Sequence, residues 1–193
     1  MRVLVGCEES GVVRDAFIAL GHDAWSCDIL PRSHPKHITG DVLPHLGDGW
    51  DLMIAHPPCT RLTTRGRYRA TAEQCGDGER FFMELASADI TRIAIENPKG
   101  VMSTRFRRPD QIIHPWQFGH RERKATCLWL KNLPLLNPTR LVDPEEPVHI
   151  DRTTGKRRYS LDYLPGNVDR GRIRSRTFTG IARAMAEQWG GVA

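Results

Sequence analysis

No stretch of this sequence approaches the roughly 20 consecutive apolar residues that a membrane-spanning helix needs, so we expect no membrane anchor. The five cysteines are an odd number, and no two of them stand in a CxxC spacing. This pattern disfavours a disulfide framework or a metal site and is typical of a protein of the reducing cytoplasm. Internal repeats and low-complexity tracts are also absent, which excludes solenoids and compositionally biased linkers.

What the sequence does contain is typical of a globular protein. Of its 193 residues, 39% are apolar and 26% are charged, which suffices for one domain with a buried core. The first residues, Met1–Gly6, read as a strand and not as a signal peptide. The net charge of +5 permits a nucleic-acid partner.

Strand and helix patterns alternate through the first 130 residues. Apolar runs between turn residues predict the five strands Arg2–Gly6, Asp23–Ile29, Asp51–Ala55, Arg92–Glu96 and Thr126–Leu130. Apolar residues at helical spacing predict the three helices Gly11–Leu20, Thr71–Ala88 and Thr179–Trp189. This order predicts an α/β fold with a doubly wound, mostly parallel sheet that helices cover on both faces. Five prolines after Leu133 predict irregular structure or short hairpins.

The tetrapeptide His56-Pro57-Pro58-Cys59 closes the third predicted strand. Proline cannot donate a ladder hydrogen bond, so the strand must stop there and leave a stiff loop. Open α/β sheets bind ligands at the carboxyl ends of their strands, where this loop presents one thiol. Cys59 is therefore a candidate nucleophile, and a buried structural cysteine is the alternative.

A second polar motif, Glu96-Asn97-Pro98, closes the fourth predicted strand. The carboxyl ends of parallel strands meet at one edge of a sheet, so we expect Glu96 and Cys59 at the same edge. Glu96 would be a proton donor there, provided that burial raises its pKa. A surface turn is the alternative.

The first strand and the first helix are joined by Gly6-Cys7-Glu8-Glu9-Ser10-Gly11, which is not a G-x-G-x-x-G motif. Small residues let a ligand approach the backbone, and the helix N-terminus would offer free N–H groups. The two glutamates would repel a pyrophosphate but tolerate an ammonium or sulfonium group. Asp28 ends the second strand, where a carboxylate commonly binds ribose hydroxyls, and Asp41 precedes the third. A tight turn is the alternative for the loop, and a turn or helix-cap role for each aspartate.

Basic residues gather at a strand entrance and in the segment 150–176. Arg121 and Arg123, two residues apart, would point to one side and could reach one site, with a solvated charge run as the alternative. The segment carries eight basic and three acidic side chains, a surplus equal to the net charge of the chain. Its alternating arginines would point one way if extended, so we interpret it as a phosphate-binding stretch, with a solvated loop as the alternative. The candidate DNA contacts are Lys156, Arg157, Arg158, Arg170, Arg172, Arg174 and Arg176, together with Arg65, Arg67 and Arg69 after Cys59.

Together these motifs resemble the DNA (cytosine-5) methyltransferases, most closely the very small versions carried by bacteriophages and prophages. The family's Pro-Pro-Cys loop matches at Cys59, its Glu-Asn-Val motif at Glu96-Asn97-Pro98, and its Arg-x-Arg pair at Arg121 and Arg123. Its closing helix is loosely matched by 178–182. The sequence departs from the family in three ways: Cys7 stands for an aromatic residue, Pro98 stands for valine, and a target-recognition domain is missing.

The resemblance implies a Rossmann-like class I S-adenosylmethionine-dependent methyltransferase fold. We expect one catalytic domain over 1–193, with 134–176 as an irregular basic insertion in place of the recognition domain. The implied cofactor is S-adenosylmethionine, the implied partner is DNA, no metal is required, and the implied location is the cytoplasm (the host's, if a phage encodes the protein). The positions implied to bind the cofactor are Cys7, Glu8, Ser10, Gly11, Asp28, Ile29, Asp41, Val42 and Pro57.

The resemblance also implies a mechanism. Cys59 would add to C6 of a flipped-out cytosine, and Glu96, kept protonated by burial, would donate to N3. Arg123 would hold the cytosine O2, and Arg121 would hold a phosphate or steady Glu96. A cysteine after Pro-Pro, where amino methyltransferases carry an aromatic residue, favours attack at a ring carbon. A methyltransferase of a free nucleotide or RNA and a non-catalytic DNA-binding protein stay open as alternatives.

Overall fold

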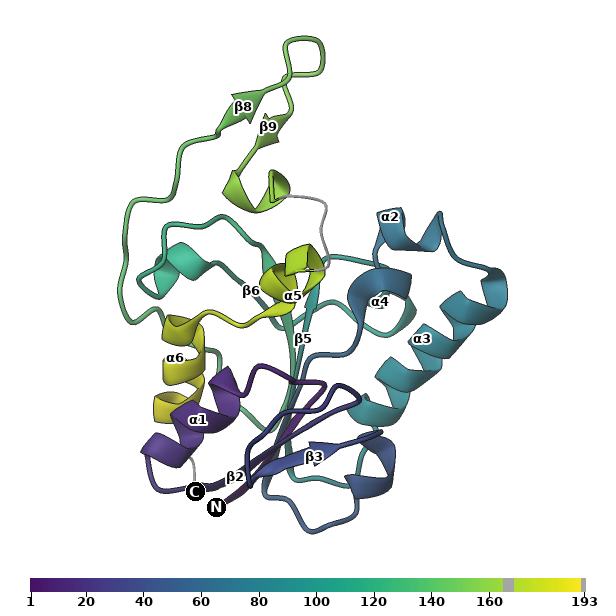
Figure 1. The fold of residues 1–193 in the computed structure, drawn as a ribbon, viewed down its shortest axis with the longest axis vertical. Coiled ribbons are helices and arrows are strands. Elements are labelled where there is room, and N and C mark those ends of the chain that lie inside the picture. The colour runs from purple at the N-terminus through teal and green to yellow at the C-terminus, as the bar shows by residue number, and fades with distance from the viewer. Residues whose placement is uncertain (165–168, 192–193) are drawn as a thin grey trace.

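The computed structural model describes residues 1–164 and 169–191, except for the side chains of Arg65, Asp169, Arg170 and Arg172. Three predicted DNA contacts, Arg65, Arg170 and Arg172, therefore lie outside the described side chains. Seven strands form one sheet in the order β3-β2-β1-β4-β5-β7-β6 (Figure 1). They are β1 (Arg2–Gly6), β2 (Asp23–Asp28), β3 (His37–Thr39), β4 (Leu52–Ala55), β5 (Arg92–Pro98), β6 (Gln111–Ile113) and β7 (Thr126–Lys131).

The sheet is mostly parallel, as predicted. Strands β1 to β5 pair in parallel, and only β7 runs antiparallel, against β5 on one side and β6 on the other. The five strands read from the sequence are all present within two residues of their expected ends. The short strands β3 and β6 were missed, because three residues are too few to show a periodic pattern.

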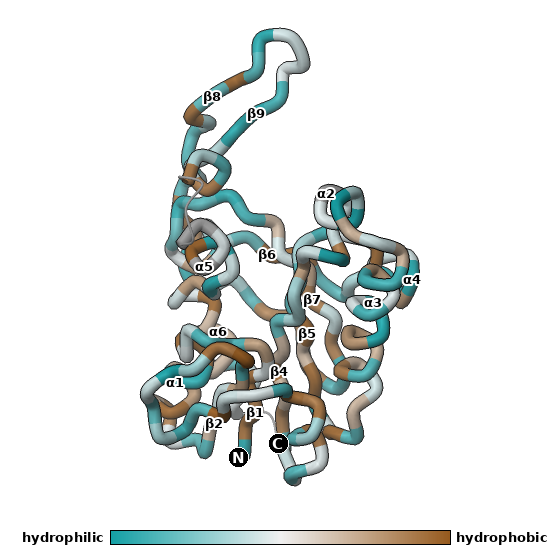
Figure 2. The backbone as a smooth tube through the Cα atoms, turned by 45° about the vertical axis from the view of Figure 1, so that its right-hand side comes forward, coloured by the Kyte–Doolittle hydropathy of each residue, from teal (hydrophilic) through white to brown (hydrophobic). Residues whose placement is uncertain are grey.

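Helices cover both faces of this sheet, and alternate residues of each strand serve the two faces. Val3 and Val5 of β1 pack with α1 (Val12–Ala19) and α6 (Thr179–Trp189) in one buried cluster. Leu4 belongs to a second cluster on the other face, under α3 (Ala72–Ala86). Figure 2 shows the hydrophobic strands between these layers. The doubly wound architecture is therefore confirmed.

The segment after Leu133 includes a short hairpin, β8 (His149–Ile150) with β9 (Arg157–Arg158), followed by a 3₁₀ turn Ser160–Asp162. We call residues 149–162 the basic arm. It projects from the body of the molecule and is mostly hydrophilic (Figures 1 and 2).

The arginines that follow the arm are not extended. Asp169–Ser175 forms the helix α5, in which residues two apart do not share a face, so the expected one-sided row of arginines is wrong. Arginine is a good helix former, and nothing in an alternating pattern of charge alone requires a strand. In the part of the chain that the structure describes, no helix has the length and apolarity to cross a membrane.

Candidate active site

Cys59 lies at the carboxyl edge of the sheet. Strand β4 ends at Ala55, and Cys59 opens the 3₁₀ turn Cys59–Arg61 after the two prolines. The residue is half-buried and belongs to neither apolar cluster. Its loop is held by Asn97, whose amide Nδ2 donates to the carbonyl oxygen of Pro57 over 2.6 Å. The thiol is therefore presented at the edge of the sheet and not packed in the interior.

Glu96 lies on the neighbouring strand at the same edge. The parallel register pairs Ala55 of β4 with Ile95 of β5, so His56 and Glu96 come next to each other. His56 Nδ1 and Glu96 Oε2 are 2.8 Å apart, and both side chains are only 9% exposed. The backbone geometry therefore brings the two strand-closing motifs together, as expected.

The protonation expected for Glu96 is wrong. Burial raises the pKa of this carboxyl, but the charge of Lys124 and the hydrogen bond and charge of His56 outweigh burial. The pKa of Glu96 consequently lies below its ordinary value, and the side chain is a carboxylate at neutral pH. Sequence reasoning allowed for burial but could not show that Lys124 and His56 lie beside Glu96.

The pKa of the Cys59 thiol is raised. Burial is the largest cause, and the negative charge of Glu96 adds to it, while Lys124 and Arg174 oppose it. A thiol in this state needs a base before it can act as a nucleophile. Glu96 is a carboxylate whose charge acts on Cys59.

The loop after β1 forms a second, negatively charged part of the site. Cys7 has a left-handed backbone with φ of 58°, which is uncommon for a residue with a side chain. Burial raises the pKa of Cys7 to about 12, and the nearby carboxylates Asp28 and Asp41 contribute to the rise. The thiol of Cys7 therefore lies near two carboxylates, one at the end of β2 and one in the segment after β3.

The helix N-terminus beside this loop is already capped. The buried carboxylate of Glu8 accepts hydrogen bonds from the backbone N–H groups of Val13 (2.6 Å) and Arg14 (3.2 Å). The Ser10 hydroxyl donates to the same carboxylate over 3.4 Å, and Gly11 supplies a left-handed turn with φ of 69°. The N–H groups that we expected to be open to a ligand are thus taken by the chain itself.

Asp28 and Asp41 each shape a turn and still face the spot around Cys7. One oxygen of Asp28 accepts from the Leu30 N–H (2.9 Å), and one oxygen of Asp41 accepts from the Leu43 N–H (3.1 Å). The side chain next to Asp28, Ile29, is 76% exposed, whereas Val42 and Pro57 are buried. Two carboxylates beside an exposed aliphatic side chain suit a ligand that carries a positive charge and an apolar ring.

Arg121 and Arg123 face the base of the basic arm. Arg121 Nε donates to the Asp143 carbonyl (3.3 Å), and Arg123 Nε donates to the Glu145 carbonyl (3.1 Å). The guanidinium of Arg123 also lies 5.3 Å from the ring centre of Tyr159. The two arginines share one side, as expected, but their described partners belong to the segment that leads into the arm.

Lys124 and His56 are the two site residues that sequence reasoning did not single out. Lys124 is the cation whose charge acts on both Glu96 and Cys59. Its position directly after the Arg-x-Arg pair was a usable signal. His56 opens the very tetrapeptide that marked Cys59, and its place beside β5 follows from the strand register.

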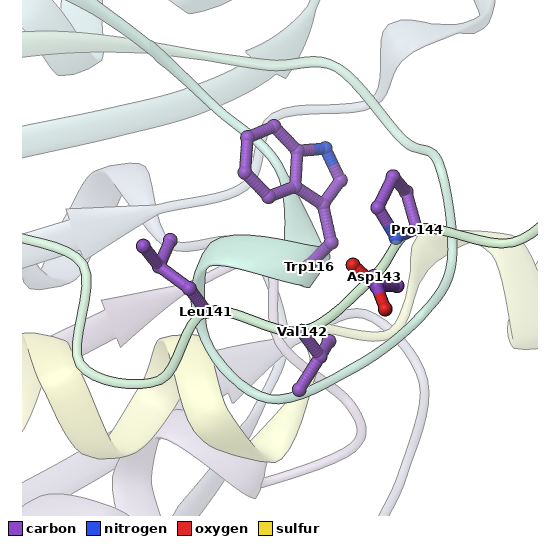
Figure 3. A pocket seen from close by; sticks show the side chains of 5 residues that line it. All are labelled: Trp116, Leu141, Val142, Asp143 and Pro144. Carbon is purple, nitrogen blue, oxygen red and sulfur yellow. The ribbon is translucent and has the colours of Figure 1, made fainter.

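Two open hollows lie near this edge. One, of about 580 Å³, is lined by Trp116 and residues 141–144, next to the carbonyl that Arg121 contacts (Figure 3). The other, of about 490 Å³, is lined by Thr64, Arg67, Lys99, Gly100 and Val101. The second lies between the segment after Cys59 and the segment after Glu96, and neither of these two residues is among those that line it. Arg67 is paired there with Glu79, and Arg69 is exposed.

The described residues contain no group of three or more histidine, cysteine or acidic side chains that could hold a metal ion.

Neither a protein-family model nor a curated protein sequence matches the chain. Among solved structures, the fold is similar to a DNA modification methyltransferase encoded within an E. coli prophage, with a TM-score of 0.53 and 13% identity. This match covers 74% of the present chain and 52% of the other.

The chain has the Rossmann-like fold of class I S-adenosylmethionine-dependent methyltransferases. A second structure, the S. pombe Dnmt2 methyltransferase, matches with a TM-score of 0.48 and 16% identity over 98% of this chain and 65% of that one. The chain spans about half the length of the prophage protein.

Proposed function

We propose that the protein is an S-adenosylmethionine-dependent DNA methyltransferase that methylates C5 of cytosine through a covalent bond to Cys59. One observation supports this most directly. The half-buried Cys59 and the buried Glu96 follow neighbouring strands at one edge of a methyltransferase fold and interact electrostatically. A structural cysteine would have no need of that partner.

The residues around Cys7 fit the cofactor. S-adenosylmethionine, when bound, would supply a methyl group on a positively charged sulfur, and the field of Asp28 and Asp41 suits that charge. Asp28 would hold the ribose hydroxyls, and Asp41 with the exposed Ile29 would contact the adenine. Glu8 would act indirectly, because its carboxylate closes the N-terminus of α1.

Cys59 and Glu96 would activate the cytosine. C5 is a poor nucleophile until a thiolate adds to C6, which makes C5 an enamine carbon. Because its pKa is lowered, Glu96 is ionised at neutral pH and can accept the thiol proton and pass it to N3 of the base. The raised pKa of Cys59 opposes this transfer, so the proton would move as the bond from sulfur to C6 forms. C5 would then take the methyl group that the cofactor supplies. Loss of the C5 and N3 protons and release of the thiolate would complete the reaction.

DNA binding would come from the basic arm and its neighbours. A base inside a duplex cannot reach Cys59, so the nucleotide must flip out at a cost of a few kcal/mol or be single-stranded already. Phosphate contacts from Lys156, Arg157 and Arg158 would offset that cost. For Arg123 to hold the cytosine O2, its guanidinium must exchange the Glu145 carbonyl for the base. We therefore assign the cation beside the reacting atoms to Lys124.

The test is covalent trapping. The protein is incubated with S-adenosylmethionine and one of four substrates that carry 5-fluorocytosine: duplex DNA, single-stranded DNA, RNA or dCMP. In parallel, transfer of a tritiated methyl group is measured on the same four substrates with normal cytosine. We expect a denaturation-resistant adduct and methyl transfer with DNA. Cys59→Ser should abolish both, and Cys75→Ser, a change at a buried cysteine of α3, should abolish neither.

The other results would replace the proposal. Methyl transfer to RNA or to dCMP alone would make the protein a methyltransferase of that substrate. DNA binding without an adduct or methyl transfer on any substrate would make it a non-catalytic DNA-binding protein. An undiminished adduct with Cys59→Ser would remove the assigned nucleophile.

A further inference from the structure

His56 is a buried side chain at the reactive edge to which the proposed chemistry gives no role. Its Nδ1 lies 2.8 Å from Glu96 Oε2, and only 9% of each side chain is exposed. Its other ring nitrogen, Nε2, is buried without a hydrogen-bond partner among the described residues. Leaving a buried polar atom unpaired is costly, which directs attention to the hydrogen bond that the other nitrogen makes with Glu96.

The position of His56 in the sheet places it between two buried carboxylates. Strand β4 runs between β1 and β5, and His56 follows its last residue. Its backbone N–H donates to the Gly6 carbonyl of β1 (2.9 Å), which fixes the ring next to β5. The ionisable groups that interact with His56 or Glu96 are Glu8, Cys59, Lys124 and Cys127.

The direction of the hydrogen bond follows from the state of Glu96. A carboxylate can only accept, so Nδ1 carries the hydrogen and donates it to Oε2. This bond fixes one oxygen of the carboxylate and leaves Oε1 for a second partner. A carboxylate held in this way is oriented before the substrate arrives, which is how positioning residues contribute to rate.

We propose, on the basis of the function proposed above, that His56 is a positioning residue whose hydrogen bond orients Glu96, so that Glu96 can relay the Cys59 proton to the cytosine. The Sγ–H bond of Cys59 breaks and its proton passes to Glu96 Oε1. The Sγ–C6 bond forms, the C5=C6 electron pair moves to C4–C5, and the C4=N3 pair moves to N3. Nitrogen N3 takes the proton from Oε1, and Glu96 returns to the carboxylate with its bond to His56 intact.

Two substitutions at His56 separate this role from simple packing. His56→Leu fills a similar volume without a donor, whereas the amide of His56→Asn places an N–H near the position of Nδ1. We expect His56→Leu to slow adduct formation about 100-fold with little change in the KM for DNA, and His56→Asn to recover most of the rate. His45→Leu is the matched control, because it removes a histidine–carboxylate pair with Asp48 before β4, at the opposite end of the sheet.

The pH profile gives a readout that packing would not move. Without the His56 hydrogen bond, burial dominates and the pKa of Glu96 rises, so Glu96 stays protonated to higher pH and cannot accept the thiol proton. The acid limb of the adduct rate should therefore shift to higher pH in His56→Leu and stay in place in His56→Asn. A pH-independent loss of rate, or equal losses in both variants, would overturn the proposal while the cytosine chemistry stands.

A titration that needs no activity keeps the two proposals separable. Carboxyl carbon NMR of the glutamates, with Glu96 assigned through Glu96→Gln, should show a higher pKa for Glu96 in His56→Leu than in the wild type. An unchanged pKa would refute the role of His56 whatever the trapping experiment shows. If the pKa of Glu96 is higher in His56→Leu but no substrate is trapped, the role of His56 toward Glu96 is supported and the proposed function is wrong.

Discussion

The reactive edge of the sheet and the basic arm are built in opposite ways. At the edge, side chains and backbone from three neighbouring strands bind one another: Asn97 to Pro57, and His56 to Gly6 and Glu96. The arm has two paired residues in each strand and is joined to the body through Glu145, which accepts from the Arg123 and Ser160 N–H groups. The proposed chemistry, which would depend on sub-ångström placement, is thus assigned to the part with many internal bonds, and the proposed phosphate contacts to the part with few.

The largest contrast is expected from a change at the edge that touches no reacting atom. Asn97→Ala removes the amide that holds the Pro57 carbonyl and so loosens the loop of Cys59. A displacement of about 1 Å in a reacting group can cost about 100-fold in rate, so we expect a loss of that order in methyl transfer with DNA affinity unchanged. Steady-state kinetics and a DNA-binding titration measure both quantities.

The exposed Asn137 provides the control for this change. Asn137→Ala should leave the rate as it is. A loss of DNA affinity instead of rate in Asn97→Ala would place this residue in the binding surface and weaken the division between the two regions.

A smaller and different effect is expected from the arm. Replacing Lys156, Arg157 and Arg158 by glutamine should lower the slope of log affinity against log salt by about 3 and weaken DNA binding roughly tenfold at physiological salt. The rate at saturating DNA should not change, because these side chains are remote from the reacting atoms.

The control for the arm removes the same charge elsewhere. Glutamine at the exposed residues Arg80, Arg140 and Arg183 gives an equal net charge and should leave the salt slope nearly unchanged. Equal slopes in the two triple variants would show that the arm has no special part in binding.

The two regions also differ in what the sequence could predict. Strands β1, β4 and β5 were predictable because they are buried on both faces and read as apolar runs between turn residues. Their parallel pairing then placed Cys59 and Glu96 at one edge. In the segment after Leu133, by contrast, charge and proline content predicted only irregular structure or short hairpins, and the helix α5 was not predicted.

Within the site, the ionisation of the side chains could not be predicted from the sequence. The positions of Cys59 and Glu96 follow from strand order, but the ionisation of Glu96 depends on His56 and Lys124, which approach it from two other segments. The partners of Arg121 and Arg123 likewise lie more than 20 residues away, at carbonyl groups of Asp143 and Glu145. Pairings of this range are set by tertiary packing, which local patterns do not contain.

The smallest effect, on the Tm, is expected from substitutions at two carboxylates that each accept hydrogen bonds from two backbone N–H groups. Glu8 caps α1 from a buried position at the edge, and Asp151 binds the Thr153 and Thr154 N–H groups at the exposed tip of the arm. Losing a helix cap costs about 1–2 kcal/mol, so Glu8→Ala should lower the Tm by a few degrees. Asp151→Ala should leave the Tm unchanged, because unfolding of the sheet does not depend on the arm.

The pH dependence of the Tm sharpens this last contrast. Burial raises the pKa of Glu8, so the folded protein favours the protonated form. The stability that Glu8 contributes is complete below its ordinary pKa and declines as the pH rises through the raised value of the folded state. Glu8→Ala should remove that decline and therefore cost less at neutral than at acidic pH, whereas the Tm of Asp151→Ala should follow the wild type at every pH. A drop in Tm with Asp151→Ala as large as that with Glu8→Ala would mean that arm and sheet unfold as one cooperative unit.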